Sequence, residues 1–407
     1  MSIFSLPGIP NIHSHAFQRA MAGLAERKSQ RDDSFWTWRE LMYRFAGRVT
    51  PESMHDIAAQ LFVEMLAAGY TSVCEFHYLH HQAGGRPYDD PAAMSRSIIA
   101  AARETGIRLT LLPVLYMSGG FDGRPLSERQ RRFGHSLESY LSLLQQLRSE
   151  EGPLLRVGIA LHSLRAVPAL AMRELFALRD AAAGQPIHIH VAEQIAEVEE
   201  CEALRGCRPV EWLLANAPVD ENWTLVHATH LTATELRGIA QSRAVVALCP
   251  TTEANLGDGL FPLREFIGQG GRFGIGSDSN VSVSPVEELR WLEYGQRLVA
   301  RQRNIASTDE LPSVGESLIL QSVSGGRQSN GLGAQHEDRL MLDQESLSLA
   351  GAAAVDVHDR FVFAGNRSLV KDVFVAGAQV IKDRRHARGE EIASRYRRTL
   401  RALLADS

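Results

Sequence analysis

The sequence predicts an α/β chain whose main part is a (β/α)8 TIM-like barrel, followed by a smaller β-containing part. Three observations support this expectation. Eight short runs of strand-forming residues alternate with longer patterns of helical periodicity. Eight strand–helix units match this barrel, whereas a doubly wound sheet has about five to seven strands. Polar residues also gather where the runs end, on the face where such barrels build their sites.

The eight predicted strands follow one another over the first part of the chain. They cover residues 8–15, 71–78, 108–116, 155–163, 186–193, 223–230, 244–251 and 272–279. Between most of them, stretches such as 52–69, 136–152 and 168–184 place apolar residues at helical spacing and stop at a glycine. We therefore expect a helix to return the chain from one parallel strand to the next.

Each predicted strand is apolar for most of its length and becomes polar near its end. The polar residues are His13, His15, Glu75, Tyr78, His162, His190, Glu193, His227 and Asp278. Packing needs alone would scatter histidines among loops and surfaces. The pattern therefore predicts an active site at the carboxyl ends of the strands.

The remaining sequence differs in character. We expect the barrel to occupy residues 1–325, and a small β segment with a terminal helix to occupy 326–407. Residues 325–335 are rich in Gly, Ser and Asn and are predicted to be a loop. Residues 370–385 predict two strands around a glycine turn, and 390–405 predict a basic amphipathic helix whose arginines face solvent.

The bulk composition excludes several classes of protein. The 407 residues carry a formal net charge of −5, which gives no electrostatic reason to expect nucleic acid or an anionic membrane as partner. No apolar run reaches about 18 residues, and no secretory signal is recognised. The four cysteines fit neither a zinc-finger spacing nor a disulfide framework, so we expect a cytoplasmic protein.

The strand ends offer a set of metal ligands. Residues i and i+2 of a strand point to the same side, so His13 and His15 can reach one ion together. His190 and Asp278 add a third imidazole and a carboxylate from later strand ends. This donor set suits zinc with an open position, and Fe2+ or Mn2+ would also fit. His188 shares the side of His190, so periodicity leaves the choice between them open.

Groups for proton transfer lie beside these ligands. Glu193 follows His190 by three residues, and His227 ends the sixth strand. A carboxylic acid near a metal site can carry a proton to a departing nitrogen. Four further histidines near the strand ends have open roles. His230 could support the site or face solvent, and His77, His80 and His81 are loop candidates.

A resemblance sharpens this interpretation. The stretches "PGIPNIHSHAFQRAMAGLAE", "FWTWRELMYR", "EFHYLHH", "LHSLRAV", "HIHVAEQ", "LVHATH", "TTEANLGDGLFP" and "GIGSDSNVSVSPVEELRWLEYGQRL" occur in this order over about residues 6 to 305. Together they resemble the amidohydrolase superfamily of metal-dependent barrels. More narrowly, they resemble the formimidoylglutamate deiminase family, which acts in histidine degradation.

The resemblance implies specific roles for individual residues. His13, His15, His190 and Asp278 would hold one zinc, which selects His190 over His188. Asp278 would accept a proton from the attacking water, and Glu193 and His227 would assist proton transfer. The implied substrate-binding residues are Gln18, Arg39, Tyr78, His162 and Arg165.

The chemistry of these residues suits the substrate that the resemblance implies. N-formimino-L-glutamate carries two carboxylates and an amidine-like head, and arginine forks pair well with carboxylates. Its hydrolysis would give N-formyl-L-glutamate and ammonia. One alternative is deamination of another small amidine or an aminated purine or pterin ring, which Arg39 and Arg165 disfavour. A second is a truncated remnant without catalysis, and a homodimer is a further expectation.

Two features depart from the resembled family. Asn280 stands where relatives often have a histidine, and an asparagine cannot hold a titrating proton. Relatives also place several strands before the His-x-His pair, whereas about a dozen residues precede His13 here. We therefore expect a small, incomplete β-sandwich domain that lacks its N-terminal strands.

Overall fold

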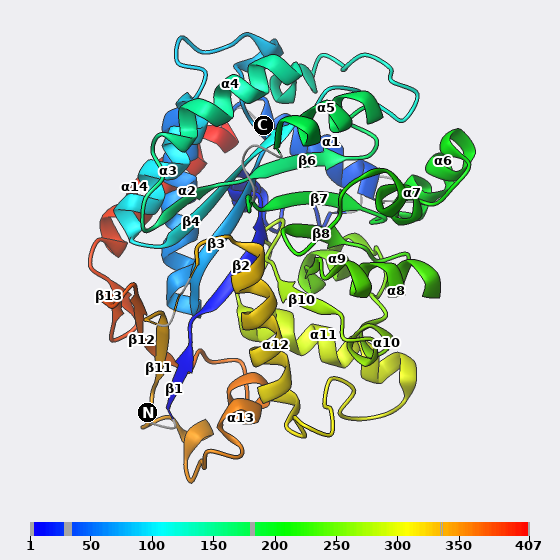
Figure 1. The fold of residues 1–407 in the computed structure, drawn as a ribbon. Coiled ribbons are helices and arrows are strands. Elements are labelled where there is room, and N and C mark those ends of the chain that lie inside the picture. The colour runs from blue at the N-terminus through cyan, green and yellow to red at the C-terminus, as the bar shows by residue number, and fades with distance from the viewer. Residues whose placement is uncertain (1–3, 28–34, 180–183, 334, 336, 406–407) are drawn as a thin grey trace.

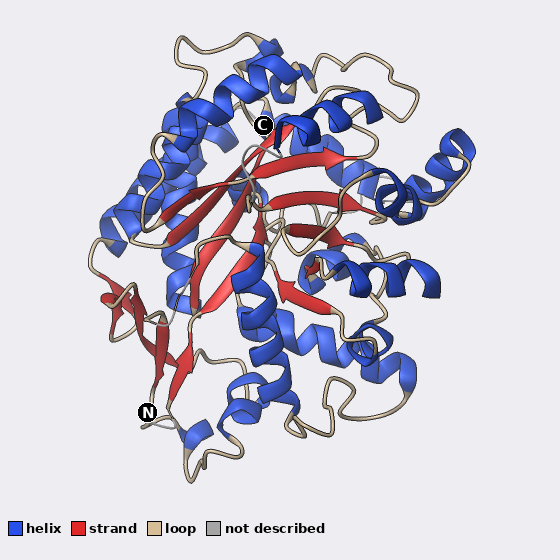
Figure 2. Ribbon diagram, viewed as in Figure 1, coloured by secondary structure: helices blue, strands red, loops and turns tan. Residues whose placement is uncertain are grey.

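The computed structural model describes residues 4–27, 35–179, 184–333, 335 and 337–405. Its main part is a closed ring of parallel strands surrounded by helices (Figures 1 and 2). The ring closes because β3 pairs with both β2 and β4, and β2 also pairs with β10. The strands are β2 (Ile9–Ser14), β3 (Tyr70–His77), β4 (Arg108–Leu115), β5 (Leu155–Val157), β6 (Ile159–Ser163), β7 (Ile187–Val191), β8 (Trp223–His227), β9 (Val245–Leu248) and β10 (Arg272–Ile275).

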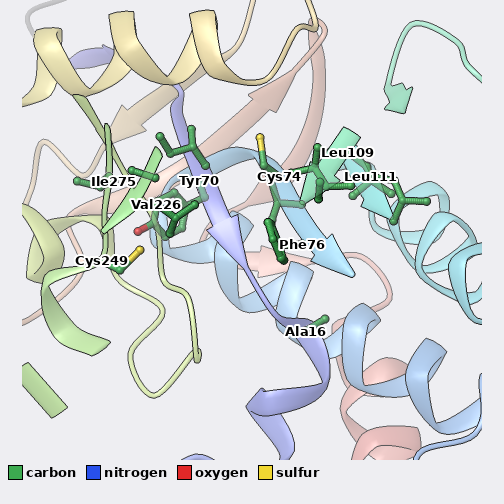
Figure 3. Close-up of a cluster of buried hydrophobic side chains, with 14 of the residues drawn as sticks. Ala16, Tyr70, Cys74, Phe76, Leu109, Leu111, Val226, Cys249 and Ile275 are labelled. Atoms are coloured by element: carbon green, nitrogen blue, oxygen red, sulfur yellow. The ribbon is translucent and has the colours of Figure 1, made fainter. Parts of the chain in front are cut away.

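The predicted eight-stranded barrel is confirmed. Each predicted run contains one strand of the ring, and the run 155–163 contains the pair β5 and β6. Gly158 separates that pair, where a Cβ atom would lie 2.6 Å from Leu112 and 2.9 Å from Pro186. The strands are buried on both faces, and their apolar side chains form the core, part of which Figure 3 shows around Cys74, Leu109 and Val226.

The described helices cover the outside of the ring or lie against the carboxyl ends of its strands. They are α1 (Phe35–Ala46), α2 (Pro51–Ala68), α3 (Ala93–Thr105), α4 (Leu137–Arg148), α5 (Ala169–Arg179), α6 (Ile195–Arg205), α7 (Pro209–Asn216), α8 (Ala233–Ser242), α9 (Pro250–Leu256), α10 (Leu263–Gly268), α11 (Pro285–Ala300) and α12 (Val314–Ser329). Helix α2 shows how the sequence sets their ends. Thr50 and Ser53 form a capping box, and Gly69 ends the helix at a φ of 113°. The helix expected over 168–184 corresponds to α5, and residues 180–183 lie outside the described part.

The prediction of a loop over 325–335 is wrong for the first five of these residues, which belong to α12. A Cβ atom on Gly325 would lie 2.0 Å from the carbonyl oxygen of Phe273, and one on Gly326 would lie 2.7 Å from Pro10. The glycines therefore let the helix approach the barrel strands closely, and do not interrupt it. Helix α12 runs across the predicted division at residues 325 and 326. The division of the chain into two parts stays a prediction.

A small antiparallel sheet lies outside the barrel, near the N-terminus in Figure 1. Its order is β1 (Ser5–Pro7), β11 (Arg339–Leu342), β12 (Val370–Val375), β13 (Ala378–Lys382) and β14 (Arg385–His386). The two strands predicted over 370–385 are confirmed, with Gly377 in the turn at a φ of 78°. The sequence did not predict β1, which brings residues before His13 into this sheet.

The chain ends in α14 (Gly389–Ala405), which lies beside α2 and α3 (Figure 1). The helix was predicted, but not all its arginines face solvent. Arg395 donates to Glu104 at 2.7 Å and to Asp56 at 3.2 Å, which ties α14 to both barrel helices. Short elements complete the description: η1 (Ala16–Met21), η2 (Ala83–Gly85), η3 (Arg131–Phe133), η4 (Leu347–Leu349) and α13 (Val357–Phe363). No described helix is long and apolar enough to cross a membrane.

Candidate active site

The polar strand ends meet in one pocket of about 730 Å³ at the carboxyl ends of the barrel strands. Ten of the eleven residues predicted for the site line it, and the eleventh, His13, lies fully buried beneath them. The ten are His15, Gln18, Arg39, Tyr78, His162, Arg165, His190, Glu193, His227 and Asp278. Residues from elements far apart in sequence therefore share one cavity.

The four predicted metal ligands converge at the floor of this pocket. The Nε2 atoms of His13 and His190 are 3.0 Å apart. Asp278 Oδ1 lies 3.4 Å from His13 Nε2 and 3.3 Å from His15 Nε2. His188 points elsewhere, because its Nε2 bonds the carbonyl of Ser329 on α12 at 3.1 Å.

The ligand rings are held in the form that binds a cation. His15 Nδ1 donates to the carbonyl of Phe76 at 2.8 Å, and His190 Nδ1 donates to the carbonyl of His162 at 2.9 Å. A carbonyl oxygen can only accept, so each Nδ1 carries the hydrogen and each Nε2 turns a lone pair to the centre.

The electrostatics agree with a cation site. Desolvation lowers the pKa of His13 to about 3, and it also lowers the pKa values of His15 and His190. Desolvation opposes ionisation of Asp278, but its hydrogen bond with His13 and the nearby imidazoles hold its pKa below the usual range. Three neutral imidazoles and one carboxylate are the protonation states that a divalent metal requires.

The two proton-transfer candidates adjoin the ligands. His227 Nε2 lies 3.8 Å from Glu193 Oε1 and 3.8 Å from Asp278 Oδ2. Desolvation raises the pKa of Glu193. Desolvation lowers that of His227, but the surrounding carboxylates outweigh it and raise its pKa overall. The raised pKa of Glu193 favours its protonated form, which can act as a proton donor.

Several of these groups sit on strained backbone at the strand ends. His227 has a φ of 66° and Asp278 has a φ of 46°, both in the left-handed region. Ala192, beside Glu193, has a φ of 52°. Glu197 stabilises that turn, since its carboxylate accepts from the backbone N–H groups of Ala192 at 3.1 Å and Glu193 at 3.2 Å.

Asn280, where a histidine was expected by resemblance, is a fully buried clip between two strand ends. Its Nδ2 donates to the carbonyls of His15 at 3.1 Å and Asp278 at 3.0 Å. Its Oδ1 accepts from Ser277 Oγ at 2.6 Å. The amide donors fix the backbone of two metal-ligand candidates.

The rest of the pocket lining holds the predicted substrate contacts and several aromatic side chains. Gln18 Nε2 donates to the Tyr78 hydroxyl at 2.8 Å, and the Arg39 guanidinium lies 5.6 Å from the Tyr43 ring centre. Further lining residues that sequence reasoning missed are Trp38, Met42, Tyr43, Tyr116, Phe133, Ser163, Glu197, Thr252 and Leu256. Tyr116 ends a predicted strand and Tyr43 lies one helical turn after Arg39, so strand-end and helical spacing could have found both.

The histidines without an assigned role lie outside the pocket. His80 and His81 contact the ring of His135 at centroid distances of 4.5 and 4.9 Å, and His77 contacts His80 at 5.2 Å. His80 and His81 bond the carbonyls of Val114 and Gly134, which fastens the loop after β3. His230 lines a separate shallow hollow.

A model of the amidohydrolase family matches residues 4–312. The chain belongs to the amidohydrolase family. It is 52% identical to a formimidoylglutamate deiminase of Pseudomonas aeruginosa, over 96% of this chain and 87% of that protein. A 5-methylthioadenosine/S-adenosylhomocysteine deaminase of Natronomonas pharaonis is 25% identical over 93% of this chain and 81% of its own length.

Solved structures agree with the family assignment. A crystal structure of an amidohydrolase from Brucella melitensis superposes on this chain with a TM-score of 0.92 at 45% sequence identity. The superposition covers 98% of this chain and 90% of the Brucella chain. An adenosine deaminase from Xanthomonas campestris with bound zinc superposes with a TM-score of 0.82 at 20% identity, over 98% and 86% of the two chains. This second likeness shows that the fold is shared.

Proposed function

We propose that this chain is a zinc-dependent formimidoylglutamate deiminase that hydrolyses N-formimino-L-glutamate to N-formyl-L-glutamate and ammonia. The observation that carries the proposal is a single pocket with a four-ligand cluster at its floor and two arginines, Arg39 and Arg165, on its wall. The 52% identity to a deiminase of that name supports the same substrate.

His13, His15, His190 and Asp278 would hold the metal. Bound there, zinc would polarise the formimino group and lower the pKa of the attacking water. Fe2+ or Mn2+ suits the same donors, so the metal content of the purified protein decides its identity.

The proposed reaction moves protons from the attacking water to the departing nitrogen, and the chain has two groups for this. Starting from the protonated, amidinium form of the head, Asp278 takes one proton from the attacking water as its oxygen bonds to the formimino carbon and the C=N double bond opens. Glu193 then gives a proton to the amino nitrogen, the C–N bond breaks and ammonia leaves, and Glu193 takes back the remaining hydroxyl proton as the formyl C=O forms. His227 stabilises the charge that develops between the two groups. His227 Nε2 lies 3.8 Å from both Glu193 and Asp278, and this place between the two groups supports the division of roles.

The outer pocket supports recognition of a dicarboxylic substrate. Arg39 and Arg165 each offer a guanidinium fork for a carboxylate. Gln18, Tyr78 and His162 add directional hydrogen bonds nearer the ligand cluster. The substrate would therefore lie with its amidine head inward and its carboxylates outward.

One observation favours a second candidate, deamination of an aminated purine or pterin ring. Trp38, Tyr43, Tyr116 and Phe133 form a wall on which a planar ring could stack. The two arginines have no partner on such a neutral ring. A non-catalytic remnant is disfavoured because all of the ligand and proton-transfer groups are present.

Ammonia release decides among these functions. Zinc-loaded protein should release ammonia from N-formimino-L-glutamate, and not from adenosine- or guanine-type substrates. Asp278→Asn should abolish the release, and full activity in that variant would contradict the role given to Asp278. We further propose a homodimer, testable by light scattering, and a cytoplasmic location, which four free cysteines favour.

A further inference from the structure

Glu253 is a buried carboxylate that the function above does not use. It lies in the first turn of α9, and only 4% of its surface is exposed. Its neighbours Thr252 and Leu256 line the pocket, whereas Glu253 lies behind His227. Its Oε1 accepts from the backbone N–H of Cys249 at 3.0 Å and faces His227 Nδ1 at 3.3 Å.

The contact fixes which face of the His227 ring meets the pocket. Nδ1 donates to Glu253, so Nε2 is the nitrogen that faces Glu193 and Asp278 at 3.8 Å each. His227 has a left-handed backbone conformation, and its ring stacks on that of His190 at 5.6 Å. Stacking alone allows the ring to flip, whereas an acceptor at Nδ1 selects one orientation.

We propose that Glu253 is a positioning residue of the reaction, which keeps a hydrogen of His227 on Nδ1 and stabilises the positive charge that develops on that ring during the reaction. The proposal rests on the function proposed above. Glu253 acts through His227 and touches neither the substrate space nor the four metal-ligand candidates. The same logic of a base oriented by a third group operates in many hydrolases.

A metal-ligand role is the competing explanation, because His227, Cys249 and Glu253 have potential donor atoms within 4.8 Å of one another. Two observations disfavour it. Glu253 Oε1 already accepts two N–H groups, and desolvation raises the pKa of the Cys249 thiol well above its usual value. A protonated thiol is a poor ligand.

Two substitutions separate the hydrogen bond from the charge. In Glu253→Gln the amide oxygen can still accept from both Cys249 and His227, so the geometry stays and only the charge is lost. Glu253→Ala removes both. Since a positioned proton carrier contributes about 10²–10⁴-fold, we expect kcat to fall about 10-fold in the first variant and about 10³-fold in the second. KM should stay within about twofold of wild type, because the substrate contacts are untouched.

Glu288→Gln is the matched control. Glu288 is another buried carboxylate that holds the same turn, where it accepts from the Thr251 N–H at 2.9 Å and the Thr251 hydroxyl at 2.6 Å. It does not contact His227, so kcat should remain at the wild-type value. In a His227→Ala background, Glu253→Gln should not lower kcat any further. If Glu253→Gln lowered kcat there by as much as it does in the wild-type background, the proposal would be overturned.

A measurement without turnover keeps this inference separate from the proposed function. In holoenzyme labelled with ¹⁵N-histidine, and at a pH where the spectrum shows the His227 ring to be neutral, NMR should find its hydrogen on Nδ1 in wild type and Glu253→Gln, and mixed tautomers in Glu253→Ala. An unchanged tautomer in Glu253→Ala would overturn the proposal. A fall from two zinc ions per chain in wild type to one in that variant would also overturn it. Wild type inactive on N-formimino-L-glutamate would overturn the proposed function, while the NMR result would still decide the role of Glu253.

Discussion

Asn280→Asp tests whether the ends of β2 and β10 must be clipped together for metal binding. The substitution keeps the shape of the side chain but replaces the Nδ2 donor with an oxygen. The carbonyls of His15 and Asp278, which Nδ2 reaches at 3.1 and 3.0 Å, would then face an acceptor. Both carbonyls are buried, so water cannot replace the lost donor.

The expected loss follows from the number of broken bonds. Each buried polar group left unpaired costs about 1–3 kcal/mol, and a protonated aspartic acid could restore one of the two bonds. We therefore expect a loss of about 2–4 kcal/mol in the free energy of unfolding. At about 0.85 kcal/mol/K for a chain of this length, Tm would fall by about 2–5 °C. Zinc affinity should fall about 10–100-fold, as for other groups that orient metal ligands.

The assay combines a thermal melt of the metal-free protein with zinc titration against a competing chelator. Asn216→Asp is the control, because Asn216 Nδ2 makes one exposed hydrogen bond to the carbonyl of Trp212. That variant should change stability by no more than about 0.5 kcal/mol and leave zinc affinity unchanged. An Asn280→Asp protein with wild-type Tm and wild-type zinc affinity would refute the clip.

Three further predictions concern packing and recognition. Gly325→Ala should destabilise the fold by about 1–3 kcal/mol in a denaturant titration, because its Cβ would meet the Phe273 carbonyl. Gly268→Ala is the control, and it should be neutral or slightly stabilising because the space around Gly268 is open. Arg395→Ala should release α14 from the barrel, seen as faster proteolytic loss of the C-terminus, and an unchanged rate would contradict the anchoring role. Arg165→Lys should raise KM for N-formimino-L-glutamate about 10-fold or more, since lysine cannot bind a carboxylate with two parallel bonds; equal KM values would remove Arg165 from substrate binding.

The sequence predicted the barrel because its signals are local and repeated. Each strand is a short apolar run, and each helix has a periodic face and an end signal such as Gly69. The residues at strand ends were predictable for the same reason, since parallel strands deliver their carboxyl ends to one face. His13, His15 and Asp278 needed no knowledge of long-range packing to be placed in one site.

Features that depend on long-range contact were not predictable. The glycines at 325 and 326 have the composition of a loop, and only the distance to Phe273 and Pro10 explains them as contact points of a helix. Periodicity alone made His188 and His190 equally good candidates for the metal ligand. The structure excludes His188 because its ring bonds the carbonyl of Ser329, which lies 141 residues further along the chain. In both cases a distant element decides between two locally equivalent interpretations.

The site also shows how strained backbone is held in place. His227 and the turn before Glu193 adopt left-handed conformations that cost about 1–3 kcal/mol per residue. Each is fastened by a carboxylate from the first turn of a helix, Glu253 for the His227 ring and Glu197 for the Glu193 backbone. Since these carboxylates lie one step removed from the reacting atoms, strand-end reasoning could not find them. In these two cases a strand end supplies the group that reacts, while the first turn of α6 or α9 supplies the carboxylate that orients it.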